Sequence, residues 1–251
     1  MSGPRRWLRR AATGAVGLCL SAALVLAVEI QLARMGPPRT PVDFDLDVDG
    51  PGLRMVWLGD STAAGAGASS VEGTLPRQVA AGLGQPVAVR VLAHSGATVA
   101  DVLHRQVGQV AALRPDVVLV SVGANDTTHL TARGQFRRRY EKLVADLAGP
   151  GDGGGAKAVE VVLLGVPDMG AAPRLAQPLR AVAGRRGERL DAEIATVAAA
   201  HQVRYVDIAR STGSAFRRHP DRYFAADRYH PSDAGYALWA RAVLAVLHSS
   251  S

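Results

Sequence analysis

The sequence has almost no cysteine. Cys19 is the only one among 251 residues, so the chain cannot form an intramolecular disulfide. Aromatic residues are also scarce, at 5%, whereas hydrophobic residues together make up 48% of the chain. A buried core must therefore be built mainly from valine, leucine and alanine side chains. The length is sufficient for one α/β domain with a small additional segment.

Lysine is nearly absent, yet arginine gives the chain a net charge of +7 and a pI of about 10.3. Clusters such as Arg137-Arg138-Arg139 are one feature of nucleic-acid-binding proteins. No aromatic stacking platform or nucleic-acid module accompanies them in the sequence, and a solvated basic surface explains them equally well. We therefore expect no nucleic-acid partner.

The first ten residues carry four arginines, and no charged residue follows from Ala11 to Val28. This apolar segment is just long enough to span a bilayer, and the preceding arginines favour a cytoplasmic amino end. Two interpretations remain open: an uncleaved signal anchor, or a signal peptide cleaved after Val25-Leu26-Ala27. Either one predicts that the rest of the chain is exported, and is then either anchored in the cell membrane or secreted.

A segment rich in proline and aspartate follows, with four prolines and four aspartates between Gly36 and Gly52. Such a composition does not form a core and indicates a stiff, charged spacer. The sequence thus divides into a signal or anchor part at residues 1–35, a spacer at 36–52 and a folded domain at 53–251.

Beyond the spacer, short apolar runs alternate with amphipathic segments, which predicts strands and helices in turn. Because each strand is followed by a helix or a helix-bearing connection, we expect a five-stranded parallel sheet covered on both faces. The strands are predicted at Leu53–Leu58, Pro86–Leu92, Asp116–Val122, Val159–Val166 and Val203–Ile208. The helices are predicted at Thr74–Leu83, Val99–Leu113, Phe136–Leu147, Arg185–Ala200 and Ser232–Leu247.

Polar residues gather where three of these strands end. Gly59–Ser61 follows the first strand, Ala93–Ala97 the second and Gly123–Asp126 the third. A fourth polar motif, Asp227–Pro231, precedes the last helix and can reach the same edge of the sheet. Ligands of open α/β sheets bind outside the carboxyl ends of the strands, so we expect the functional site there.

The residue types in these loops suit acyl transfer. Ser61 would be the nucleophile, and His230 the base that accepts its proton. Asp227 can accept a hydrogen bond from the other ring N–H and so fix the tautomer of the imidazole. The developing oxyanion needs fixed donors, and the candidates are the backbone N–H groups of Ser61 and Gly96 and the side-chain amide of Asn125. A glycine at 96 would let the backbone approach closely.

The four motifs resemble those of the SGNH/GDSL hydrolase family in order and spacing. Gly59–Ser61 matches its serine block, Gly96 its glycine block, Gly123–Asp126 its Gly-x-Asn-Asp block and Asp227–Pro231 its Asp-x-x-His-Pro block. The resemblance covers about Leu53–Leu247. It implies a flavodoxin-like, three-layer α/β/α fold of strand order 2-1-3-4-5, and ester hydrolysis through an acyl-serine without a metal or cofactor.

One departure from the family pattern lies beside the serine, where Thr62 replaces the common Leu or Ile and changes the local packing. The implied function is an exported, monomeric serine esterase acting on an ester of a small molecule, a lipid or an acylated glycan. An O-acyltransferase using the same serine remains open, as do an inactive wall-binding domain and a flavin binder. The loop Val166–Gly170 is expected to shape the acyl pocket, and His219-Pro220 to lie in a surface loop.

Overall fold

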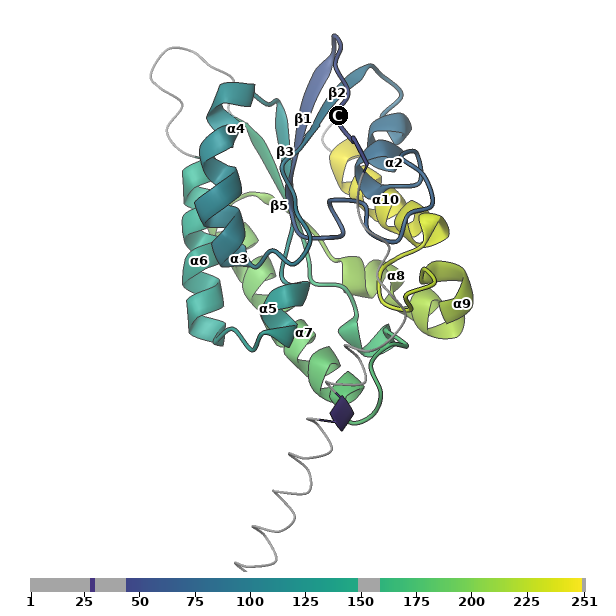
Figure 1. The fold of residues 1–251 in the computed structure, drawn as a ribbon. Helices are drawn as coiled ribbons and strands as arrows, with labels where there is room; N and C mark the ends of the chain where they lie inside the picture. Colours follow the sequence, from purple (N-terminus) through teal and green to yellow (C-terminus); the bar gives the residue numbers. More distant parts are fainter. Residues whose placement is uncertain (1–27, 30–43, 149–158, 250–251) are drawn as a thin grey trace, which may run out of the picture.

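The structure is a computed structural model that describes residues 28–29, 44–148 and 159–249 (Figure 1). Its centre is a five-stranded parallel sheet with the order β2-β1-β3-β4-β5. The parallel direction and the order confirm the predictions. The strands are β1 (Leu53–Gly59), β2 (Val87–Val91), β3 (Val117–Ser121), β4 (Glu160–Leu164) and β5 (Arg204–Val206).

Helices cover both faces of the sheet and give the fold three layers (Figure 1). One face carries α3 (Val99–Asp101), the π-helical turn η1 (Val102–Gln106), α4 (Val107–Leu113), α6 (Arg133–Leu147) and α7 (Leu179–His201). The other carries α2 (Leu75–Gly82), α8 (Ile208–Arg218) and α10 (Asp233–His248). Three short helices lie in the connections: α5 (Ala124–Thr128), η2 (Met169–Ala171) and α9 (Pro220–Tyr223).

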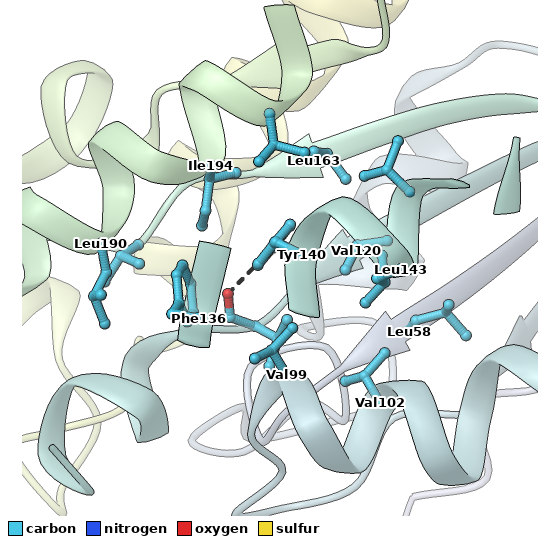
Figure 2. Packing of buried hydrophobic residues seen from close by; sticks show 14 of the residues in the cluster. Leu58, Val99, Val102, Val120, Phe136, Tyr140, Leu143, Leu163, Leu190 and Ile194 are labelled. Atoms are coloured by element: carbon cyan, nitrogen blue, oxygen red, sulfur yellow. Dashed lines mark hydrogen bonds between the residues drawn. The ribbon is translucent and has the colours of Figure 1, made fainter. Parts of the chain in front are cut away.

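The strands supply both halves of the core because successive side chains of a strand point to opposite faces. In β1, Val56 and Leu58 join the cluster under α6 and α7, whereas Met55 and Trp57 join the cluster under α2 and α10. Figure 2 shows the first cluster, in which aromatic and aliphatic side chains of α6 and α7 meet residues of the sheet. Strands β1, β3 and β4 thus lie between two apolar layers.

Helix α8 was not predicted. The predicted fifth strand extended to Ile208, but β5 ends at Val206 and Ile208 begins the helix. Asp207 stops the strand because its side chain caps the helix, accepting a hydrogen bond from the backbone N–H of Arg210 at 2.8 Å. Helix α7 also differs from its prediction, since it begins at Leu179 rather than Arg185.

The predicted helix Val99–Leu113 contains the π-helical turn η1, which brings Gln106 to the end of β1. Gln106 is buried and pairs with both backbone groups of Gly59. Its Oε1 accepts the N–H of Gly59 at 2.8 Å, and its Nε2 donates to the carbonyl of Gly59 at 2.9 Å. The side chain of Gln106 thereby satisfies both backbone groups of Gly59, as a neighbouring strand would.

Part of the predicted spacer packs on the domain. Leu46 is only 4% exposed, and the backbone groups of Val48 and Val89 exchange hydrogen bonds of 2.9 and 3.0 Å. Asp47 and Asp49 both form ion pairs with Arg90 of β2. The prediction of a spacer up to residue 52 is therefore wrong for residues 44–49, because these aspartates have a cationic partner on the sheet.

Within the described ranges, the helices are too short or too polar to cross a membrane. The predicted signal or anchor segment lies outside the described residues, apart from Val28 at its end. Both interpretations of that segment therefore remain predictions.

Candidate active site

Three polar side chains from distant parts of the sequence form a row of hydrogen bonds at the carboxyl edge of the sheet. The Oγ of Ser61 lies 2.9 Å from Nε2 of His230, and Nδ1 of His230 lies 2.5 Å from Oδ2 of Asp227. The histidine and the aspartate are buried, whereas Ser61 is partly exposed. The geometry is that of a serine whose proton can pass to an imidazole oriented by a carboxylate.

The turn around His230 fixes the carboxylate of Asp227. Its Oδ1 accepts hydrogen bonds from the backbone N–H groups of Tyr229 at 2.9 Å and His230 at 3.0 Å. Burial raises the pKa of Asp227, but the hydrogen bond and the charge of His230, with the two backbone donors, outweigh burial and lower the pKa to about 2. Asp227 therefore remains an anion that can stabilise an imidazolium.

Ser61 stands at the start of a helical turn that follows β1. Its carbonyl accepts a hydrogen bond from the N–H of Ala66 at 2.8 Å, and the N–H of the preceding Asp60 donates to the carbonyl of Ser121 at 3.0 Å. At Gly59, φ is +144°, and a Cβ there would lie 2.0 Å from the carbonyl oxygen of Ser121. A glycine is required because strands β1 and β3 approach closely where the chain turns toward the serine.

The threonine at position 62 has a defined polar role. Its Oγ1 donates to Oδ1 of buried Asp60 at 2.8 Å and lies 2.9 Å from Oγ of Ser121. Burial raises the pKa of Asp60 to about 6, although the bonds from Thr62 and the charge of His230 counteract it in part. The departure from Leu or Ile thus supplies a partner for a buried carboxyl group, which an aliphatic side chain does not provide.

The three proposed oxyanion donors lie on three neighbouring loops. Asn125 donates one amide hydrogen to the carbonyl of Ala97 at 3.0 Å, which leaves the second hydrogen for a ligand. Within the described part of the chain, the backbone N–H groups of Ser61 and Gly96 make no hydrogen bond. Gly96 is exposed with φ at +84°, and nothing lies within 4 Å of a Cβ placed there, so conformation rather than crowding favours glycine.

A pocket opens beside the serine, lined on its polar side by Ser61, Asn125 and His230. Its other walls are mostly apolar and come from η2, α8, α10 and the loop before α10. They include Met169, Ala172, Gly213, Phe216, Phe224 and Trp239. The loop Val166–Gly170 contributes to this pocket as expected. Among the described residues, no cluster of His, Cys, Asp and Glu side chains could hold a metal ion.

Comparison with known proteins agrees with this geometry: residues 57–238 match the GDSL-like Lipase/Acylhydrolase family. The chain belongs to this family. A GDSL-like esterase of Mycobacterium tuberculosis (strain ATCC 25618 / H37Rv) is 35% identical over 209 residues. The match covers 80% of the present chain but only 62% of that esterase, so the chain spans less than two thirds of its relative's length.

Solved structures of three other proteins have a similar fold. A lipase/acylhydrolase from Enterococcus faecalis is 25% identical with a TM-score of 0.60, and covers 79% of this chain and 96% of its own. Phospholipase A1 from Streptomyces albidoflavus NA297 is 23% identical, with a TM-score of 0.59 and coverages of 80% and 100%. An acetylxylan esterase from Geobacillus stearothermophilus is 22% identical, with a TM-score of 0.57 and coverages of 79% and 95%.

The sequence motifs of the GDSL family located the polar residues but not what supports them. The structure brings Ser61, His230 and Asp227 together as the spacing suggested, and places Asn125 on the same pocket. His94 and His129 follow β2 and β3 but do not line this pocket, and His219 is exposed as expected. Gln106 was missed because nothing in a helical pattern signals that one turn is π-helical. The pocket wall from α8 could have been found from the helical spacing of Ile208, Thr212 and Phe216.

The lowered pKa of Asp227 predicts a loss of stability in acid. Its folded-state pKa of about 2 lies below the ordinary value of 3.8, so the anion stabilises the fold above that pH. The stabilisation is lost as the pH falls from 3.8 toward 2. We expect the difference in free energy of unfolding between the native protein and Asp227→Asn to shrink between about pH 5 and pH 2.5. Urea unfolding measures it, with exposed Asp221→Asn as the control. If the difference in free energy of unfolding stays constant over this pH range, the contact between Asp227 and His230 is contradicted.

The position of Asn125 predicts that its substitution lowers kcat much more than it lowers stability. Asn125→Ala should lower kcat by about 10²–10³-fold if the free amide hydrogen faces the oxyanion. The lost bond to Ala97 should cost only about 0.5–1.5 kcal/mol of stability. Thr128→Ala is a matched control, because it removes a single side-chain hydrogen bond from the same short helix at an exposed position. Ester-hydrolysis kinetics and thermal melts of both variants test this. If Asn125→Ala has the same kcat as the native protein, Asn125 has a structural role and does not stabilise the oxyanion.

Proposed function

We propose that this chain is a serine esterase that cleaves carboxylic esters through an acyl-Ser61 intermediate. The observation that carries the proposal is the 2.9 Å contact between Ser61 Oγ and Nε2 of a histidine whose other nitrogen faces an anionic aspartate. Membership of the GDSL-like lipase/acylhydrolase family supports it.

In the proposed reaction, neutral His230 removes the proton of Ser61 as the oxygen attacks the ester carbonyl. Asp227 stabilises the resulting imidazolium and holds its ring in place. The N–H groups of Ser61 and Gly96 and the amide of Asn125 donate to the oxyanion. The imidazolium then gives its proton to the leaving alcohol, and a water molecule activated by the same histidine releases the acid.

The substrate class is part of the proposal. Proteins of similar fold include one named a phospholipase and one named an acetylxylan esterase, so the fold is compatible with lipid and glycan esters alike. We assign the chain to esters in general, with the acyl group in the pocket beside Ser61. The walls of that pocket, rather than the fold, decide which esters are accepted.

The proposed location is outside the cytoplasm. The arginine-rich end and the uncharged segment Ala11–Val28 support export, with the segment retained as a membrane anchor or removed by cleavage. A catalytic domain beginning near Phe44 would then act at the outer side of the membrane.

Ser61 should be the residue that reacts. A fluorophosphonate probe is expected to label Ser61 in intact protein, and mass spectrometry of the labelled peptides identifies the site. Ser61→Ala should abolish both labelling and hydrolysis of p-nitrophenyl esters while its thermal melt stays near that of the native protein. Ser211→Ala, at an exposed position on α8, is the control; this variant should still be labelled at Ser61 and should still hydrolyse the esters. Labelling of a different serine would refute the proposal.

Export predicts that the domain is open to attack from outside the cell. Protease added to intact cells should degrade the chain beyond residue 36, and cells opened beforehand should show the same fragments plus loss of the amino end. The amino-terminal residue of the mature protein decides between cleavage and anchoring. Full protection of the domain in intact cells would overturn the export proposal.

A further inference from the structure

The pocket beside Ser61 shares a wall with a second cavity. The first has a volume of about 40 Å³ and the second about 260 Å³. Pro167 and Asp168 line both of them, and Arg217 lines the second. The side chain of Asp168 therefore stands between the two spaces, at the end of the loop that follows β4.

Asp168 is held firmly in this wall. Its Oδ2 accepts a hydrogen bond from Nε of Arg217 at 2.5 Å, and its Oδ1 accepts one from the backbone N–H of Gly170 at 3.1 Å. The aspartate side chain is 10% exposed, whereas that of Arg217 is 61% exposed. Because both carboxylate oxygens have donors, the side chain cannot turn out of the wall without losing charge-assisted hydrogen bonds.

The first pocket has mostly apolar walls that are well packed. Met169, Phe216 and Trp239 are each at most 4% exposed, so the apolar walls are themselves packed against the core. Core side chains at native packing density do not move aside without a cost in stability.

We propose that the Asp168–Arg217 ion pair bounds the acyl pocket and makes the enzyme prefer esters of short acids. The inference rests on the proposed esterase function. The acyl group occupies the enclosed pocket because it stays on Ser61 after the first step, while the alcohol must leave and admit water. A longer acyl chain has to displace a paired charge, which is unfavourable because one buried partner is left uncompensated.

Two substitutions should change the pocket in opposite directions. Asp168→Ala removes the carboxylate from the wall and widens the pocket toward the second cavity, whereas Asp168→Asn keeps the volume of the side chain. Gly213→Ala adds a methyl group to the wall of the pocket, which Gly213 lines, and its Cβ would press on the side chain of Asp168 at 3.0 Å from Oδ2. Arg133→Ala is the matched control, because it removes an exposed arginine from buried Glu193, and neither residue lines the pocket.

The measurement is kcat/KM for p-nitrophenyl acetate, butyrate, hexanoate and octanoate. The native protein should favour acetate and butyrate over octanoate by at least about tenfold, and Asp168→Asn, which keeps the volume but loses the charge pair, should show a smaller preference. In Asp168→Ala the octanoate-to-acetate ratio should rise at least about tenfold, and in Gly213→Ala the butyrate-to-acetate ratio should fall. Arg133→Ala should keep the native profile. If Asp168→Ala does not fold, Gly213→Ala decides the question.

Three results would overturn the inference: native activity that is flat from acetate to octanoate, a folded Asp168→Ala with the native profile, or a Gly213→Ala with an unchanged butyrate-to-acetate ratio. A second series, acetates of alcohols of increasing size, separates the two sides of the ester. If Asp168→Ala changes that series instead, the pocket holds the alcohol and the inference is wrong. Each of these outcomes leaves an active enzyme, whereas failure of the proposed function would show as hydrolysis that survives Ser61→Ala.

Discussion

The close approach of β1 to β3 at Gly59 is the constraint on which the site depends. The carbonyl of Ser121 occupies the space that a side chain at position 59 would need, and Gln106 pairs with both backbone groups of Gly59 from the other side. The main chain is therefore held on two sides just before it turns. The serine owes its position to these contacts, which lie outside the motif that carries it.

The site also holds two buried carboxyl groups whose pKa values are shifted in opposite directions. Asp60 accepts hydrogen bonds from the backbone N–H and the hydroxyl group of Thr62. These uncharged donors do not offset the loss of hydration, so the pKa of Asp60 rises to about 6. Asp227 faces an imidazole and two backbone donors, and its pKa falls to about 2. The results differ because Asp227 hydrogen-bonds directly to the imidazole of His230, whereas loss of hydration dominates at Asp60. The histidine accordingly has a permanent anion on one side and the serine on the other.

Much of this architecture followed from the sequence. The order and direction of the strands came from alternating apolar runs and a family resemblance, and the structure has the same order. What failed were features that depend on partners far away in the sequence. Asp47 and Asp49 were assigned to a spacer because the sequence does not show that their partner is Arg90, which lies beyond β1 in the chain. The strand predicted up to Ile208 ended early because one aspartate caps the next helix.

In the site, too, residues in short motifs could be predicted, whereas residues that depend on distant partners could not. Ser61, Asn125 and His230 are recognisable because each lies in a short motif with its own spacing. Gln106 and the ion pair of Asp168 with Arg217 carry no such signature, since their meaning appears only when the loops are folded together. Residues that perform chemistry are thus easier to find from sequence than residues that shape the space around it.

The segment at residues 44–49 has a practical consequence for handling the protein. Strand β2 is at the margin of the sheet, and its outer backbone groups would otherwise be free to pair with another molecule. Val48 satisfies two of these groups, and the aspartates beside it place negative charge along the same margin. A truncated form starting at Leu53 would uncover this strand and invite self-association, so a soluble fragment should begin before Phe44.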